Sequence, residues 1–232
     1  MRAPTVVLFD VDGTLVTTGG AGRRAMAAAF AEVHGSPEAL DGIRLGGATD
    51  RAILRAALSR LDLSLTDARF DAIIQVYLGQ LTGEVERSPG YRVLTGARRL
   101  LEALSCDAHI GLGLGTGNVR EGALVKLRRG SLDGYFRFGG FGSDSEARSE
   151  LLEFGFRRGA QRMGLARERV RVVVVGDTPK DVHAAHEVGA ECLAVATGNA
   201  SEEELRAAGA ERVVRELSCH SVVAFLRGET RA

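Results

Sequence analysis

Short apolar runs alternate along the chain with longer stretches in which apolar residues recur at helical spacing. The short runs are rich in valine and leucine, a pattern typical of strands that are buried on both faces of a sheet. They occur at residues 5–9 (TVVLF), 109–116 (HIGLGLGT), 171–175 (RVVVV), 192–197 (CLAVAT) and 212–214 (RVV). Because helical patterns separate these runs, we predict an α/β fold with a doubly wound, mainly parallel sheet.

The first two predicted strands lie much farther apart than a single crossover requires. Roughly a hundred residues separate them, whereas a parallel crossover needs about a dozen. Within the intervening stretch, apolar residues recur at helical spacing at 53–61 and 70–81. Glycine and proline occur near its two ends, in TTGGAG (17–22) and SPGYR (88–92), as is common in hinges.

These features predict two domains. Residues 20–88 would form a helical cap domain inserted after the first strand, and residues 1–19 and 89–232 would form the α/β core domain. The stretch TGARRLLEAL (95–104) would then be the helix that leads back to the sheet, with Thr95 as its N-cap.

The composition narrows the class of partner. Thirty basic residues balance thirty acidic ones, so the chain has no overall positive field for nucleic acid or an anionic membrane surface.

No apolar run forms a signal peptide or approaches the roughly 20 residues of a membrane span, so we expect a cytoplasmic location. Cys106, Cys192 and Cys219 lack ligand spacing, which fits buried thiols in a reducing cytosol. Nothing in the sequence indicates the oligomeric state.

Polar clusters lie at the ends of three of the predicted strands. Asp10 and Asp12 follow the first strand, GTGN (115–118) ends the second, and GDTPKD (176–181) follows the third. In a doubly wound parallel sheet, ligands bind at the carboxyl ends of the strands. Each cluster also has a purely structural interpretation, as an Asx-turn or as the N-cap of a helix. Three such clusters favour a functional site.

The motifs D-x-D-G-T, a helical cap, a strand that ends in threonine, and G-D-x-x-x-D follow one another along the chain. In this order they resemble the haloacid dehalogenase superfamily, and within it the phosphatases similar to phosphoglycolate phosphatase. The resemblance extends from Asp10 to Asp181 and covers nearly the whole chain. It implies a Rossmann-like core with a mobile cap, and a magnesium-dependent phosphatase that hydrolyses a small phosphate monoester through an aspartyl-phosphate intermediate.

The resemblance also implies roles for the acidic residues. Asp10 would be the nucleophile that attacks phosphorus, and Asp12 the general acid-base that protonates the leaving oxygen and then activates water. Two carboxylates cannot approach a phosphate dianion without added positive charge, so the site needs a hard cation with oxygen ligands. The resemblance implies that magnesium is held by Asp10, the backbone carbonyl of Asp12 and Asp177, with Asp181 either as a further ligand or orienting a water.

The phosphate group would be bound at the end of the second predicted strand. The Thr116 hydroxyl would donate to a phosphate oxygen, and the Gly117 and Asn118 amides would assist at a helix N-terminus. In the first motif, Gly13 would let the chain turn closely beneath the phosphate, and Thr14 would hold the loop by a local hydrogen bond.

The resemblance calls for a basic residue beside the nucleophile and the phosphate, but the chain departs from the usual lysine-proline pattern. Arg148 follows a glycine-rich strand end in FGSDSEARSELL, and a guanidinium suits phosphate as a fork of donors. Lys180 lies within the G-D-x-x-x-D segment, and Lys126 lies in an arginine-rich helix; they are the only lysines of the chain. We expect Arg148 to fill the role, with Lys180 and then Lys126 as alternatives, although each could instead be a solvated helix charge.

The predicted cap contributes candidate substrate contacts. LGGATD (45–50) resembles the cap loop that approaches the active site in relatives, so Gly47, Thr49 and Asp50 are candidates to contact substrate. The alternative is a tight turn followed by an N-cap. Arg23, near the start of the first cap helix, could meet an anionic substrate or remain a solvated charge.

Other activities of the same superfamily can be judged by their chemistry. A dehalogenase does not need the second acid, Asp12, and a phosphonatase of the known type needs a cap lysine, which residues 20–88 lack. A mutase similar to β-phosphoglucomutase keeps both acids and stays an alternative, as does a phosphate-binding regulatory module without turnover. The sequence does not indicate which small phosphorylated molecule is the substrate.

Overall fold

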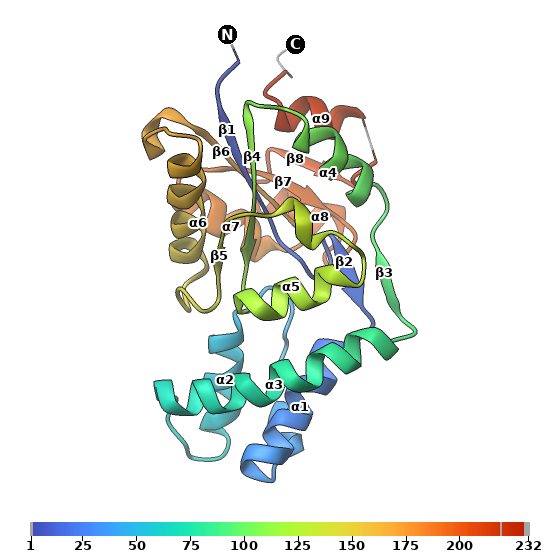
Figure 1. The fold of residues 1–232 in the computed structure, drawn as a ribbon, viewed down its shortest axis with the longest axis vertical. Coiled ribbons are helices and arrows are strands. Elements are labelled where there is room, and N and C mark those ends of the chain that lie inside the picture. The colour runs from blue at the N-terminus through green and yellow to red at the C-terminus, as the bar shows by residue number, and fades with distance from the viewer. Residues whose placement is uncertain (1, 219, 230–232) are drawn as a thin grey trace.

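A computed structural model describes residues 2–218 and 220–229 of the chain. Its central feature is a six-stranded sheet in the order β5-β4-β1-β6-β7-β8, in which all neighbouring strands are parallel (Figure 1). This sheet confirms the predicted Rossmann-like α/β fold. Its strands are β1 (Thr5–Phe9), β4 (Ile110–Thr116), β5 (Gly139–Phe141), β6 (Arg171–Gly176), β7 (Glu191–Val195) and β8 (Arg212–Val214).

Helices cover both faces of the sheet because its central strands carry apolar side chains on both sides. All five residues of β1 are buried, with Val7 and Phe9 facing one helical layer and Val6 and Leu8 facing the other. The first layer is α4 (Ala97–Ser105), α5 (Arg120–Arg128) and α9 (His220–Leu226), and the second is α6 (Arg148–Arg162), α7 (Pro179–Glu187) and α8 (Glu202–Ala207). Two short 3₁₀ helices, η2 (Asp133–Tyr135) and η3 (Arg167–Arg169), lie in connections.

Residues 20–88, which we call the helical insert, lie between β1 and β4 in sequence and beyond the carboxyl ends of these strands in space (Figure 1). Side chains such as Phe30, Leu54 and Ile73 form a hydrophobic cluster that consists mostly of insert residues and also includes Val119 of the core. The insert comprises α1 (Ala21–His34), η1 (Pro37–Leu40), α2 (Asp50–Ser59) and α3 (Asp67–Arg87). The elements are helical as expected, whereas their independence as a cap domain stays a prediction.

The two predicted hinges lie side by side, and each overlaps a short strand. The first overlaps β2 (Val16–Thr18) and the second overlaps β3 (Tyr91–Val93). The two strands pair antiparallel, and the Ser88 hydroxyl donates to the Thr18 carbonyl at 2.7 Å. Gly19 has a φ of 58°, and a Cβ there would lie 2.6 Å from the Gly90 Cα. This close approach of two backbones requires glycine.

Some expectations from the sequence are wrong in detail. Helix α4 begins at Ala97, and its N-cap is Gly96 in the left-handed region (φ 84°), so Thr95 is not the N-cap. Cys192 is buried as expected, but Cys106 is exposed. The prediction for Cys219 lies outside the described residues. No helix in the described part of the chain combines the length and apolar character that a membrane span requires.

Candidate active site

Three buried carboxylates meet at the carboxyl ends of two adjacent strands. Asp10 follows β1, Asp177 follows β6, and Asp181 lies in the first turn of α7. One oxygen from each lies within 4.8 Å of the others. Strands β1 and β6 are parallel and in register, so their ends bring Asp10 and Asp177 together, although 167 positions separate these residues in the numbering of the chain.

The loop after β1 and two glycines leave room for Asp177. The Thr14 hydroxyl donates to Asp177 Oδ1 at 3.0 Å, so its hydrogen bond is long-range rather than local as predicted. Gly13 has a φ of 85°, and a Cβ there would lie 2.3 Å from Asp177 Oδ2. At Gly198 a Cβ would lie 1.8 Å from the same oxygen. Larger residues at either position would displace the carboxylate.

Asp181 belongs to the acid cluster and also caps the start of α7 together with Thr178. Its Oδ2 accepts from the Thr178 amide at 3.0 Å and from the Thr178 hydroxyl at 2.7 Å, which completes a capping box at the start of α7. Pro179 is the first residue of that helix. The structural interpretation of GDTPKD as a helix start is therefore confirmed, and it coexists with the gathering of acids.

Of the three basic candidates, Arg148 is the one whose side chain reaches the Asp10 carboxylate. Its Nη2 lies 3.2 Å from Asp10 Oδ2 and also forms an ion pair with Asp181 Oδ1. The buried Arg148 Nε has no hydrogen-bond acceptor among the described residues. Lys180 is exposed and lies against the loop of the insert, where a Cβ on Gly47 would come within 3.1 Å of its Cδ.

The acids outnumber the cations in this cluster. Burial raises the pKa of Asp10 to about 6, although the Arg148 guanidinium and the Thr116 hydroxyl oppose the rise. Burial also raises the pKa of Asp177, and the charges of Asp181 and Asp10 add to the effect. Three buried carboxylates share one guanidinium, and their oxygens converge. This donor set fits a hard divalent cation that binds oxygen ligands.

The Asp12 side chain points to different partners. Its Oδ2 accepts from Lys126 Nζ at 2.6 Å and from Asn118 Nδ2 at 2.9 Å. The side chain is 40% exposed, in contrast to the buried Asp10. The Asp12 side chain is not part of the three-acid cluster. A metal contact by the backbone carbonyl of Asp12 stays a prediction.

Lys126 is a buried cation, although the sequence favours it least of the three basic candidates. Its Nζ also donates to Asn118 Oδ1 at 2.6 Å, and Asn118 Nδ2 donates in turn to Thr116 Oγ1 at 2.8 Å. Burial lowers the pKa of Lys126, but the neighbouring acids, above all Asp12, outweigh burial and raise it above its ordinary value. Lys126 therefore stays charged and lies beside Asp12 rather than beside Asp10.

The loop of the helical insert lies directly on the predicted phosphate-binding loop. The Asp50 amide donates to the Gly117 carbonyl at 2.7 Å, and Asp50 Oδ2 accepts from the Val119 amide at 2.7 Å. Thr49 is the N-cap of α2 and donates to the Glu146 carbonyl at 3.2 Å. The loop thus contains the N-cap that was one of the two interpretations of its sequence, and it also contacts the core.

The other two candidates of the insert occupy different surroundings. Gly47 has a φ of 65° and packs against Thr178, from whose Oγ1 a Cβ would lie only 2.9 Å. The Arg23 guanidinium donates to the Leu40 carbonyl at 3.0 Å and to the Ile43 carbonyl, both within the insert. The structure thus brings Gly47 near the active-site loops and ties Arg23 to the insert. Substrate contacts by either residue stay predictions.

Replacing Asp50 by asparagine is expected to stabilise the fold at neutral pH. Burial raises the pKa of Asp50 from 3.8 to about 6, although Lys126 and the Val119 amide oppose the rise. Because the native pKa is the higher one, the stability associated with the protonated acid is present below about pH 3.8 and is lost as the pH rises through about 6. The shift corresponds to about 3 kcal/mol, which Asp50→Asn would recover at pH 7 while keeping an acceptor for Val119.

The free energy of unfolding in urea tests this at about pH 4 and about pH 8. At the lower pH, wild type and Asp50→Asn should have nearly equal free energies of unfolding. At the higher pH, the free energy of unfolding of Asp50→Asn should be the larger one. Asp67→Asn is the control, because Asp67 also begins a helix of the insert but its side chain is 87% exposed. A gain for Asp50→Asn that is the same at both pH values would contradict the assignment.

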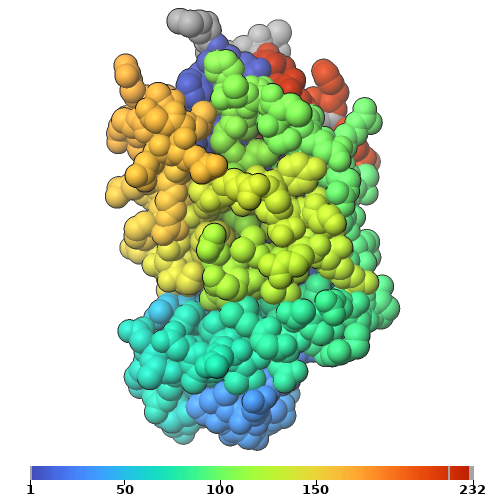
Figure 2. Space-filling model, viewed as in Figure 1, coloured from blue at the N-terminus to red at the C-terminus, as the bar shows by residue number. Residues whose placement is uncertain are grey.

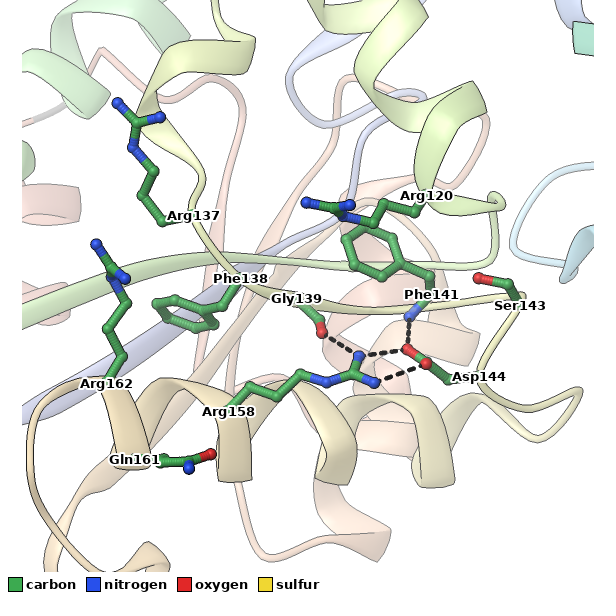
Figure 3. A pocket seen from close by; sticks show the side chains of 10 residues that line it. All are labelled: Arg120, Arg137, Phe138, Gly139, Phe141, Ser143, Asp144, Arg158, Gln161 and Arg162. Carbon is green, nitrogen blue, oxygen red and sulfur yellow. Dashed lines mark hydrogen bonds and ion pairs between the residues drawn. The ribbon is translucent and has the colours of Figure 1, made fainter.

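A separate cavity of about 600 Å³ lies beside β5 (Figure 3). None of the clustered acids lines it. The Arg158 guanidinium donates to both oxygens of Asp144 at 2.6 and 2.8 Å and to the Gly139 carbonyl at 2.8 Å. Asp144 in turn accepts from the Phe141 amide at 2.9 Å. This ion pair thereby occupies backbone groups of β5, and three more arginines lie around the cavity: Arg120, Arg137 and Arg162.

Comparisons with known proteins agree with this arrangement. The family model for haloacid dehalogenase-like hydrolases matches residues 4–189, which is most of the chain. Comparison with curated protein sequences finds no match.

Similar solved structures cover nearly the whole chain at low identity. A hydrolase from Pseudomonas syringae superposes with a TM-score of 0.66 at 21% identity, covering 93% of this chain and 94% of that one. A candidate β-phosphoglucomutase from Bacteroides vulgatus gives 0.65 at 17% identity, covering 100% and 92%. A predicted phosphoglycolate phosphatase from Haemophilus somnus gives 0.60 at 18% identity, covering 94% and 96%. At these identities the structures establish the shared fold, and together with the match over residues 4–189 they lead to one conclusion: the chain belongs to the haloacid dehalogenase-like hydrolases.

Proposed function

We propose that the protein is a magnesium-dependent phosphatase that hydrolyses a small phosphate monoester through an aspartyl-phosphate intermediate. The observation that carries the proposal is the buried cluster at the strand ends, in which Asp10 lies 3.2 Å from Arg148 and beside Asp177 and Asp181. A carboxylate that is buried among other acids and one guanidinium suits a nucleophile that receives a phosphate group, because the guanidinium can bind the phosphate oxygens.

In the first step, a carboxylate oxygen of Asp10 forms a bond to phosphorus as the bond between phosphorus and the leaving oxygen breaks. Asp12 gives its proton to the leaving oxygen. In the second step, Asp12 takes a proton from water, the water oxygen attacks phosphorus, and the bond to Asp10 breaks. The products are inorganic phosphate and an alcohol, and both aspartates return to their starting states.

The groups around the acids would orient the phosphate. The Thr116 hydroxyl accepts from the Asn118 amide and side chain, at 3.3 and 2.8 Å, so its own proton is free to be donated to Asp10 or to a phosphate oxygen. Gly117 and Arg148 would supply further donors. These residues hold the reacting atoms in place, whereas Asp10 and Asp12 carry out the covalent and proton-transfer steps.

Magnesium would be held by Asp10, the backbone carbonyl of Asp12, Asp177 and Asp181. When bound, it would offset the negative charge of the carboxylates and the phosphate oxygens. The convergent oxygens of Asp10, Asp177 and Asp181 and the raised pKa values of the first two support a divalent cation here. The choice of magnesium is part of the proposal.

Removing divalent metal is expected to abolish the hydrolysis of an aryl phosphate, and adding magnesium is expected to restore it. The physical reason is that the acid cluster has more negative charge than Arg148 alone can balance. The measurement is colorimetric release of the phenol after treatment with a chelator, followed by titration with magnesium. Full turnover in metal-free buffer would refute the metal requirement.

A panel of small phosphate monoesters would then identify the substrate class. Because a mutase similar to β-phosphoglucomutase would use the same pair of acids, the products must be examined as well as substrate loss. Release of inorganic phosphate supports the phosphatase, whereas an isomerised sugar phosphate without phosphate release supports the mutase. Phosphate binding without either product would indicate a regulatory module.

A further inference from the structure

Lys126 is a buried, charged residue of α5 whose ammonium group donates hydrogen bonds to active-site residues. It is only 5% exposed, and it donates to Asp12 Oδ2 and Asn118 Oδ1, each at 2.6 Å. Asn118 Nδ2 donates to the same Asp12 oxygen at 2.9 Å. Two donors therefore fix one oxygen of the Asp12 carboxylate, and no bond to its other oxygen is found among the described residues.

The helical insert covers the other side of Lys126. A Cβ on Gly22 of α1 would lie 3.4 Å from Lys126 Nζ, so a larger residue there would press on the ammonium group. The same Cβ would lie 4.0 Å from the Tyr77 hydroxyl of α3, and the negative charge of Asp50 on α2 raises the pKa of Lys126. Helix α3 packs on α5, and Figure 2 shows the blue and teal insert directly against the yellow-green segment that contains α5.

All three helices of the insert thus contribute to the site of this ammonium group. An ammonium group that is removed from water needs a partner, because an unpaired buried charge is costly. In the described part of the chain, its hydrogen-bond acceptors are the Asp12 carboxylate and the Asn118 amide oxygen. Covering Lys126 with the insert therefore favours the contact between Lys126 and Asp12, whereas an exposed lysine would be free to turn into solvent.

We infer that Lys126 is a positioning residue that holds the Asp12 carboxylate in its working orientation, and that the helical insert keeps Lys126 in place. The inference rests on the proposed function, in which Asp12 exchanges a proton with the leaving oxygen and then with water. In the proposed steps Lys126 neither binds phosphorus nor exchanges a proton. It acts through Asp12, and it links the position of the insert to the geometry of proton transfer.

Lys126→Met tests the positioning role, since methionine fills similar space without the charge. We expect kcat for an alkyl phosphate to fall by about 10²-fold, which is the order of loss when a catalytic group is displaced by about 1 Å. KM should change little, because Arg148 and Thr116 remain. Lys126→Arg should restore part of kcat. The control is Arg128→Met, which removes an exposed cation from the same helix and should leave kcat unchanged; Arg128 is 65% exposed.

A double-mutant cycle separates action through Asp12 from a general structural effect. In an Asp12→Asn background, Lys126→Met should cause little further loss, because the group that Lys126 positions no longer transfers a proton. Independent, multiplicative losses would overturn the inference while leaving the proposed phosphatase function intact. Absence of metal-dependent phosphate release from the wild type would instead refute the proposed function.

Amine labelling gives a readout that does not depend on activity. The chain has only two lysines, so mass spectrometry of peptides resolves them. Exposed Lys180 should be acylated rapidly, whereas Lys126 should react at least tenfold more slowly, both in the wild type and in inactive Asp10→Asn. Gly22→Leu, which crowds the Lys126 ammonium, should speed the labelling of Lys126 and lower kcat together. Equal labelling of the two lysines in the wild type, or a change in labelling without a change in kcat, would contradict the role of the insert.

Discussion

Asp10→Asn is expected to lower phosphatase turnover by about 10⁴-fold or more while the fold is retained. An amide is a poor nucleophile, so the covalent step is lost, and removal of a nucleophile is among the most damaging changes an enzyme can suffer. The fold should persist because asparagine is nearly isosteric and carries no buried charge. Burial raises the pKa of Asp10 to about 6, so a neutral group is not unfavourable at this position.

Turnover, the covalent intermediate and the fold of the variant are measured separately. Phosphate release gives the loss in turnover, and rapid acid quenching followed by mass spectrometry of the Asp10 peptide reports the phosphoryl-enzyme. Circular dichroism and thermal unfolding show whether the variant is folded. Asp144→Asn is the control, since Asp144 is paired with Arg158 beside the separate cavity and should be dispensable for turnover. A phosphoryl-enzyme that still forms in Asp10→Asn would exclude Asp10 as the nucleophile.

Asp12→Asn is expected to slow turnover by about 10² to 10⁴, or roughly 2.7 to 5.4 kcal/mol of transition-state stabilisation. Asparagine keeps an oxygen that can accept from Lys126, whereas alanine would leave that buried cation without its carboxylate partner. The loss therefore reports proton transfer with the least disturbance of the surroundings. Phosphate and metal binding should persist, because the Asp12 side chain is not part of the acid cluster.

The dependence on the leaving group is the sharper test of Asp12. An alkoxide must be protonated as it departs, whereas a phenolate leaves unaided. Single-turnover phosphoryl transfer in Asp12→Asn should consequently be slowed strongly for an alkyl phosphate and weakly for an aryl phosphate. The same comparison in the wild type provides the reference. An equal loss for both esters would rule out Asp12 as the acid.

The sequence was most informative where a strand ends in a motif. The run at 5–9 predicts β1, and the positions of Asp10 and Asp177 after their strands predict that both lie at the carboxyl edge of the sheet. Register then brings the two acids together, because β1 and β6 are neighbours. Arg148 could be proposed because it follows a strand end and because a guanidinium suits phosphate.

Contacts between segments that are far apart in the sequence could not be predicted in the same way. Lys126 lies 114 positions from Asp12, and helical spacing does not say which side chain on α5 faces the sheet or the insert. The rarity of lysine in so arginine-rich a chain was the available signal. Strands β2 (VTT), β3 (YRV) and β5 (GGF) lack the pair of adjacent valines by which the equally short β8 (RVV) could be predicted.

The ion pair beside β5 has a consequence for the behaviour of the molecule in concentrated solution. β5 is at one end of the sheet, and a terminal strand with unpaired backbone groups is a template for adding a strand from another chain. Here Arg158 binds the Gly139 carbonyl and Asp144 binds the Phe141 amide, so the side chains occupy positions that an incoming strand would need. Two charged side chains, linked to each other at 2.6 Å, thereby protect this border of the sheet against edge-to-edge aggregation.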